Sequence, residues 1–421
     1  MISLLLSTLQ RRRAQLISFC RRYQTEWTAC FCVLAVMTAA AMFTGRWCFE
    51  KNGYPTFALQ ANAWLQGRLD LGQDYPWLEL AIYEGKYYVS FPPFPSYVLL
   101  PFALFFGTET PDGLISLFFT LAGVWRAVRL AESRLGHRQE ALFWVLFLYL
   151  GTGYLFIAMT PAVWFFAQVL CFNLSVLAVA AADRGRGGRS LLYWACAVGC
   201  RPMVILFLPV LLVLLVFRVR EKNPGLFLLS LIRKYWYWAL GPLSLGGSYM
   251  LLNWLRFGNV LEFGHNYLPE FTRSPEGQFS LNYLKTNLPL LFRLPQVQGG
   301  GVFSFPTFDT ALFCLIDPLS LPILFSILWA FFARTEDPGR RLRFLLPVLS
   351  LFYILILCAH RTLGGWQFGN RYLKDVLPWL FYGLLCWMPK RGWFRQPARA
   401  LFFFGLAINL IGAVATFNNW I

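Results

Sequence analysis

Charged residues are scarce in this chain, and acidic ones are the scarcer kind. Only 14% of the 421 residues are charged, with 20 Asp and Glu against 37 Lys and Arg, while 57% are hydrophobic. Such a composition excludes a compact water-soluble domain and indicates a protein that crosses the membrane many times. The net charge of +17 does not point to nucleic acid, because the basic residues stand in short runs between apolar segments. That pattern is the positive-inside signal.

The chain also lacks the spacings of a metal centre or a disulfide framework. Its 10 cysteines lie mostly within or beside apolar segments and form no CxxC pair, which favours packed thiols. It has 3 histidines, and His265 has no partner at ligand spacing, so no zinc site is predicted. A divalent ion held by carboxylates stays open. No small-residue cleavage pattern follows the arginines at positions 11–13, so an uncleaved first helix is expected.

Eleven apolar segments are expected to cross the cell membrane. Basic runs at alternate segment ends place the N-terminus in the cytoplasm and the C-terminus on the outer side. The stretch 191–217 is too long for one crossing, and Cys200, Arg201 and Pro202 interrupt it. Because proline stops a helix and arginine avoids hydrocarbon, two helices are predicted to meet there at the outer face. The segments are residues 27–47, 114–130, 141–158, 161–182, the two halves of 191–217, 235–255, 311–332, 344–359, 376–388 and 400–417.

Three outer loops follow from this topology, at residues 47–112, 256–309 and 360–375, in a single membrane domain over residues 1–421 without a soluble domain. In the first loop, residues 54–65 repeat apolar side chains at helical spacing before Gly67, which predicts an amphipathic helix on the membrane face. The apolar run after Pro92 and Pro93 is about a dozen residues, too short for a core of ~30 Å, so we expect it to dip into the interface.

The first loop is also rich in carboxylates, which are costly beside a bilayer unless they are solvated, paired or used. We therefore expect the chemistry of the protein to lie in this loop, although single residues among them can be ordinary solvated charges. The seven acidic residues are Glu50, Asp70, Asp74, Glu79, Glu84, Glu109 and Asp112.

Four motifs and one helix break, in this order, resemble those of the GT-C membrane glycosyltransferases. They are ANAWLQGRLDL, YEGKYYVSFPPFPSYVLLP, the break at Arg201 and Pro202, NWLRFGNVLEFGHNY and GGWQFGNRYLKDVLP. Within that superfamily the chain is similar to bacterial proteins related to protein O-mannosyltransferases and aminoarabinose transferases. The resemblance implies an all-α GT-C-like fold and the transfer of a sugar from a polyprenyl-phosphate carrier to an acceptor at the outer face. That acceptor can be a protein, a lipid or a wall polymer.

The resemblance also bears on the catalytic base. The family commonly has an Asp at the start of the first-loop helix, which is taken as the base, whereas this chain reads Asn52-Gly53-Tyr54. The nearest acid is Glu50, and Glu79 stands in a second acidic position like that of the family. Inverting transfer of a hexose or pentose requires a base for the acceptor hydroxyl. We predict Glu79 or Glu50 in this role and Asp70 as third candidate; helix capping or pairing with Arg68 and Lys86 is the alternative.

The leaving phosphate requires cations, and the planar fork of arginine suits it best. Arg201 at the helix break and Arg371 in the third loop are predicted to bind it, with Lys86 and Arg256 as lesser candidates; snorkelling to the headgroups is the alternative for Arg201. Aromatic faces stack on sugar rings, so further side chains are predicted to line the sugar or acceptor site, unless they belong to an interfacial belt. These are Tyr87, Tyr88, His265, Tyr267, Trp366 and Phe368.

Two other classes of protein compete with a lipid-dependent transferase. A transporter or flippase for a lipid-linked glycan usually places charges inside its spans, whereas the charges here stand at segment ends and in loops. An inactive GT-C-like assembly partner is the second alternative, because Asn52 replaces the Asp. The enzyme account requires a first-loop carboxylate within ~10 Å of Arg201 or Arg371, about the width of one sugar between base and phosphate.

Overall fold

Apolar segments fold as helices because a helix satisfies its backbone N–H and C=O groups internally, as lipid requires. The computed structural model describes residues 18, 20–50, 52–222, 228–297, 303–304, 312–332, 338–389 and 392–420. Six helices in this part are long and apolar enough to cross a membrane. They are α2 (Gln24–Thr44), α5 (Asp112–Leu135), α8 (Val163–Asp183), η2 with α10 (Pro202–Phe207 and Leu208–Lys222), α17 (Gly339–Ala359) and α19 (Arg395–Phe417).

The other predicted spans correspond to shorter helices. These are α6 (Arg138–Leu150), α9 (Gly187–Val198), α12 (Leu240–Phe257), α16 (Ser320–Phe332) and α18 (Leu377–Trp387). The predicted all-α polytopic membrane fold is confirmed, while the count of eleven crossings stays a prediction. The predicted segment 141–158 contains two helices, because α6 ends at Leu150 and α7 (Tyr154–Ala158) begins after Gly151 and Gly153, which are poor helix formers.

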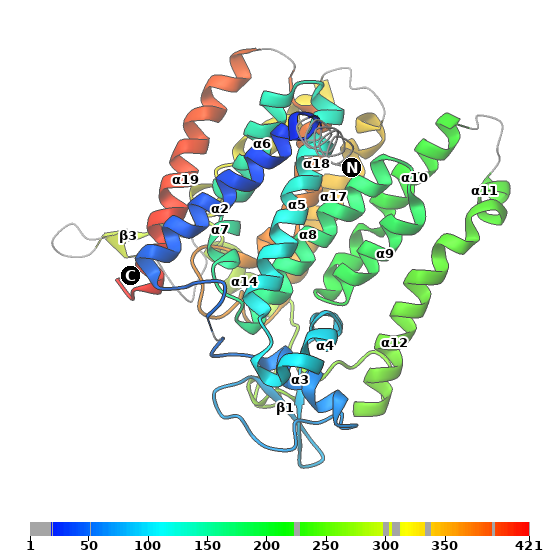
Figure 1. Ribbon diagram of the computed structural model, residues 1–421, viewed down its shortest axis with the longest axis vertical. Helices are drawn as coiled ribbons and strands as arrows, with labels where there is room; N and C mark the ends of the chain where they lie inside the picture. The colour runs from blue at the N-terminus through cyan, green and yellow to red at the C-terminus, as the bar shows by residue number, and fades with distance from the viewer. Residues whose placement is uncertain are drawn as a thin grey trace, which may run out of the picture.

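Helix α8 forms the centre of the bundle. Within its apolar window 94% of the residues are buried, and it packs against α5, α9, α10 and α18 (Figure 1). At its C-terminal end, Asp183 pairs with Arg134 and Arg218 and accepts a hydrogen bond from the Tyr382 hydroxyl at 2.8 Å. The C-terminal ends of α5, α8 and α10 thus meet at one end of the bundle, which we call the basic end.

The arginines found at the basic end are among those predicted for the inner side of the membrane. At this end Arg341 of α17 lies over the ring of Phe217, with Cζ 5.5 Å from the ring centre. The predicted inner-side cations Arg11 to Arg13, Arg334, Lys390 and Arg391 lie outside the described residues. The orientation of the bundle in the membrane stays a prediction.

The first loop covers the opposite end of the bundle, which we call the loop end. Figure 1 shows α3 (Thr56–Leu65), α4 (Phe94–Phe106) and β1 (Leu80–Tyr83) gathered there. The predicted helix over residues 54–65 is found as α3, and the apolar run after Pro93 forms α4; their placement at the membrane interface stays a prediction. Strand β1 pairs with β2 (Lys86–Val89) in an antiparallel hairpin that sequence analysis did not predict. Glu84 and Gly85 turn it with φ of +48° and +71°, as a two-residue type I′ turn requires.

The remaining elements belong to the other loops and to short connections. They are η1 (Gly107–Glu109), α11 (Leu228–Tyr235), η3 (Trp236–Ala239), η4 (His265–Tyr267), α13 (Pro269–Thr272), α14 (Asn282–Leu290), β3 (Gln296–Val297), β4 (Phe303–Ser304), α15 (Phe313–Ile316), η5 (Arg371–Asp375) and η6 (Gly392–Phe394). The predicted helix break is confirmed: α9 ends at Val198, η2 begins at Pro202, and Arg201 between them is extended with φ −141°. This backbone turns Arg201 out of the helical register.

Close packing of α19 against the α6–α7 break gives a prediction about stability. A Cβ at Gly405 would lie 2.4 Å from the backbone oxygen of Gly151, so Gly405→Ala should destabilise the protein by about 1–3 kcal/mol. The matched control is Gly246→Ala in α12, where nothing lies within 4 Å and alanine should add up to about 1 kcal/mol of helix stability. Thermal unfolding in detergent measures both; equal midpoints for the two variants would contradict this packing.

Candidate active site

Trp164, in the first turn of α8, joins the first and third loops at the loop end. Its indole Nε1 donates a hydrogen bond to Oε2 of Glu79 at 2.9 Å. The guanidinium carbon of Arg371 lies 5.9 Å from the Trp164 ring centre and 5.4 Å from that of Phe165. A first-loop carboxylate and a third-loop arginine therefore contact the same side chain.

The Glu79 carboxyl lies close to groups of other parts of the chain. Its side chain is exposed to solvent, yet burial raises its pKa above the usual value for Glu, while the Trp164 hydrogen bond and the charge of Arg371 lower that pKa to a smaller extent. An exposed group that is nevertheless desolvated has protein close to it on several sides. Because efficient bases have a pKa near the working pH, the upward shift suits proton abstraction.

The guanidinium of Arg371 has hydrogen-bond donors without partners in the described part of the chain. The residue is only 3% exposed, and within the described part of the chain Nε and Nη1 have no hydrogen-bond partner. The Nη2 group is 3.5 Å from the Tyr372 hydroxyl. Buried charges are normally paired, so two unpaired donors on a buried cation make this guanidinium a candidate anion-binding group. The fork geometry matches two oxygens of a phosphate.

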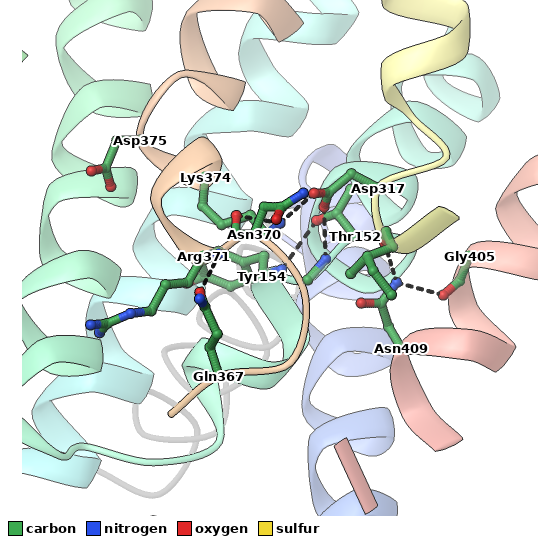
Figure 2. Close-up of polar contacts among 12 residues, drawn as sticks. Thr152, Tyr154, Asp317, Gln367, Asn370, Arg371, Lys374, Asp375, Gly405 and Asn409 are labelled. Carbon is green, nitrogen blue, oxygen red and sulfur yellow. Dashed lines mark hydrogen bonds and ion pairs between the residues drawn. The ribbon is translucent and has the colours of Figure 1, made fainter. Parts of the chain in front are cut away.

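The third loop leaves room for this guanidinium. A Cβ at Gly364 would lie 2.8 Å from Nε of Arg371, and Gly364 has φ +110°, which only glycine adopts readily. The backbone of Arg371 is held on both sides, since its N–H donates to Oε1 of Gln367 at 3.0 Å and its carbonyl accepts from Nε2 of Gln168 at 2.6 Å. Figure 2 shows the Arg371 side chain leaving η5 in the direction opposite to Lys374.

Arg201 approaches the same site but is partly neutralised. Its Nε donates to Oδ2 of Asp375 at 2.9 Å, and its guanidinium carbon lies 4.5 Å from the Tyr372 ring centre. The corresponding distance from Arg371 to that ring is 4.9 Å. Both predicted phosphate-binding arginines therefore contact one tyrosine. The ion pair with Asp375 argues against simple snorkelling of Arg201 to the headgroups.

A cavity of about 210 Å³ adjoins Trp164. Its walls include Trp47, Tyr54 and Trp366, and its polar lining includes Glu50 and Asn52. Glu50 therefore lies in this cavity, whereas Glu79 is held by the indole nitrogen of Trp164.

Asn52, which stands where the family commonly has Asp, is fixed in place. Its Nδ2 donates to Oδ2 of Asp112 at 2.8 Å and to the Pro161 carbonyl at 2.9 Å. Asp112 is buried at the start of α5. Sequence analysis counted Asp112 among the loop acids but did not single it out, because its partner lies far away along the chain.

The other predicted residues at or near the hairpin lie away from Trp164. Asp70 accepts a hydrogen bond from the Gly72 N–H at 2.8 Å, and Arg256 donates to the carbonyl of Val89 at 2.9 Å. Lys86 is exposed at the start of β2, opposite Tyr83. The structure brings none of these to Trp164 through a contact among the described residues, so their catalytic and phosphate-binding roles stay predictions.

The predicted sugar-binding aromatic residues do not gather in one place. Tyr88 and Tyr267 pack against Phe257 in a small cluster that includes the hairpin. Trp366 lines the cavity beside Trp164. The Tyr87 side chain is half-buried and Phe368 is fully packed in the core. Only Trp366 of this group thus lines the cavity, and the roles predicted for all of them stay predictions.

The second loop brings His265 and an unpredicted carboxylate close to the first loop. His265 Nδ1 lies 3.1 Å from the Ser90 carbonyl, and burial lowers its pKa to about 4, so the ring is neutral. Burial raises the pKa of Glu270, and so does the nearby Glu79, while Arg361 lowers it. Glu270 and Arg361 escaped sequence analysis because no spacing links them to Glu79. The described residues include no group of three or more His, Cys, Asp or Glu side chains that could hold a metal ion.

Neither a protein-family model nor a curated protein sequence matches the chain. Among solved structures it is similar to ArnT from Cupriavidus metallidurans bound to undecaprenyl phosphate, with 15% identity, a TM-score of 0.51, and coverage of 93% of this chain and 76% of ArnT. The apo oligosaccharyltransferase of Archaeoglobus fulgidus is 15% identical with a TM-score of 0.39, over 91% of this chain and 56% of that one. The likeness to ArnT shows the fold. This chain is a multi-pass membrane protein with the GT-C fold of membrane glycosyltransferases.

Proposed function

We propose that this protein is an inverting glycosyltransferase that moves one sugar from a polyprenyl phosphate to an acceptor at the outer face of the cell membrane. The observation that carries the proposal is the buried guanidinium of Arg371, with two donors free, on the same tryptophan as the Glu79 carboxylate. The structural neighbour ArnT was solved with undecaprenyl phosphate, which supports a donor of this class. The proposal requires that the loop end of the bundle faces the outer side of the membrane and that the basic end faces the cytoplasm.

Arg371 supplies the electrostatic part of the reaction. As the bond between the anomeric carbon and the phosphate oxygen breaks, negative charge accumulates on the departing polyprenyl phosphate. A guanidinium already desolvated and held in place stabilises that charge without reorganising. Arg201 adds a second positive charge beside the Tyr372 ring, reduced by its pairing with Asp375.

Glu79 supplies the acid–base part. The acceptor hydroxyl attacks the anomeric carbon from the face opposite the phosphate, its oxygen forms the new glycosidic bond, and its proton passes to the Glu79 carboxylate. The cavity beside Trp164 takes the sugar, with Trp366 and Tyr54 as stacking faces. At about 210 Å³ it is smaller than drug-sized sites of about 300–1,000 Å³ and suits one ring. Glu50, in the cavity lining, is the second candidate for the base.

Asn52 favours one other candidate function, a GT-C-like partner that binds the lipid without turning it over. Purified protein in nanodiscs, given a panel of polyprenyl-phosphate monosaccharides and an envelope extract as acceptor, separates the two. Transfer with release of polyprenyl phosphate supports the enzyme, and binding without release supports the partner. Failure to bind any polyprenyl phosphate contradicts both. Parallel reactions with EDTA or added Mn²⁺ test the divalent ion, and movement of lipid-linked glycan across liposomes would identify a transporter.

A further inference from the structure

A buried ion pair lies on the far side of η5 from the proposed phosphate site. Lys374 Nζ contacts Oδ2 of Asp317, and the two side chains are 0% and 3% exposed. Asp317 belongs to the segment between α15 and α16, whereas Lys374 is in the same short 3₁₀ turn as Arg371. Figure 2 shows Lys374 reaching toward Asp317 while Arg371 points the other way.

The pair ties three separate parts of the chain together. Oδ1 of Asp317 accepts a hydrogen bond at 2.9 Å from the N–H of Gly153, at the break between α6 and α7. Lys374 Nζ also donates to the carbonyl of Asn370 at 3.2 Å. A Cβ at Gly153 would lie 2.6 Å from Cε of Lys374, so the ammonium sits in a space that only glycine leaves open. Each polar atom of the pair is thus engaged and tightly enclosed.

The turn that this pair holds carries the groups of the phosphate site. In the five residues of η5, Arg371 offers the free guanidinium, Tyr372 lies against both arginines, and Asp375 binds Arg201. A turn this short cannot shift at Lys374 without moving Arg371, three residues earlier. Burying two charges is costly, and an apolar pair of similar volume would often stabilise the fold as well or better. The ion pair therefore gives the turn a fixed position more than it gives the fold stability.

We infer that Lys374 and Asp317 are positioning residues for anion binding: their ion pair fixes η5 so that Arg371 and Arg201 present their guanidiniums to one phosphate. The inference rests on the proposed function for the identity of the anion. It adds that phosphate affinity depends on a pair that touches neither the lipid nor the sugar.

The test replaces both charges at once. In D317N/K374M the asparagine keeps an acceptor for the Gly153 N–H, and no charge is left buried alone as it would be in K374M. Hydrogen exchange of amides 366–376 should accelerate, and the Kd for undecaprenyl phosphate in nanodiscs should rise about tenfold, or about 1.4 kcal/mol. The KM for the donor should rise with it, while the KM for the acceptor stays within about twofold of the wild-type value.

The matched control is Asp183→Asn, which removes a buried ion-pair partner at the basic end. It should lower the unfolding midpoint and leave both the exchange of 366–376 and the Kd unchanged. A wild-type Kd in D317N/K374M overturns the inference, whether or not exchange accelerates. If the wild-type protein binds no polyprenyl phosphate but exchange still accelerates in the double variant, the proposed function fails while the anchoring of η5 stands.

Discussion

Arg371→Met is expected to weaken binding of undecaprenyl phosphate strongly and, at the same time, to raise thermal stability. Two charge-assisted hydrogen bonds to phosphate are worth about 1.5–3 kcal/mol each, so their loss should weaken binding by about a hundredfold or more. The gain in stability follows because the guanidinium is buried with two donors unsatisfied among the described residues, and removing an uncompensated charge from the interior relieves its desolvation cost. Binding assays in nanodiscs and thermal unfolding measure the two effects.

A variant that gains thermal stability while it loses lipid binding identifies a functional arginine, because loss of a structural arginine would lower stability. The lipid affinity and the thermal stability of Arg371→Lys should both lie between those of the wild type and Arg371→Met, since lysine keeps the charge but loses the planar, two-pronged donor group of arginine. Arg273→Ala, an exposed cation of the second loop, serves as the control and should change neither quantity. An Arg371→Met protein that unfolds at lower temperature and binds the lipid normally would show that Arg371 holds the fold together instead.

Glu79→Gln is expected to reduce kcat by about 10²–10⁴-fold, the range for removing a general base, while lipid binding stays within a few-fold of normal. The wild-type kcat/KM should fall as the pH drops through the pKa of Glu79, because only the carboxylate accepts a proton. That pKa is raised by burial, so the acidic limb should lie above the usual range for Glu. The limb should disappear in Glu79→Gln.

Two further variants sharpen this prediction. Trp164→Phe removes the hydrogen bond that lowers the Glu79 pKa, so its acidic limb should move to higher pH. Glu50→Gln, at the cavity, should cost much less than Glu79→Gln. If Glu50→Gln falls to background and Glu79→Gln keeps full turnover, the base is Glu50 and the assignment made here is wrong.

The helical bundle could be predicted from the sequence because a long apolar segment in lipid must form a helix to satisfy its backbone hydrogen bonds. The break at Arg201 was predictable for the same reason, since proline and a charge together interrupt a membrane helix. The β1–β2 hairpin carried a local signal in Glu84-Gly85, but its strands are only four residues each and alternate weakly. The break of α6 at Gly151 and Gly153 was overlooked because the flanking residues are apolar throughout.

The candidate site was predictable only residue by residue. Glu79 and Arg371 could be chosen from charge and loop position, yet their meeting at Trp164 depends on how α8 enters the bundle. The pairing of Arg201 with Asp375, the proximity of Glu270 to Glu79 and the link from Lys374 to Asp317 join positions far apart in the chain. No local pattern specifies such contacts, since each is fixed by helix packing.

The most direct test is the structure of this protein with undecaprenyl phosphate bound. We predict phosphate oxygens within about 3 Å of Nε or Nη1 of Arg371, the distance of a hydrogen bond, with the Glu79 carboxyl facing the position of the sugar. A phosphate bound at Lys86, at Arg256 or at the basic end, with the Arg371 donors still unengaged, would contradict the account.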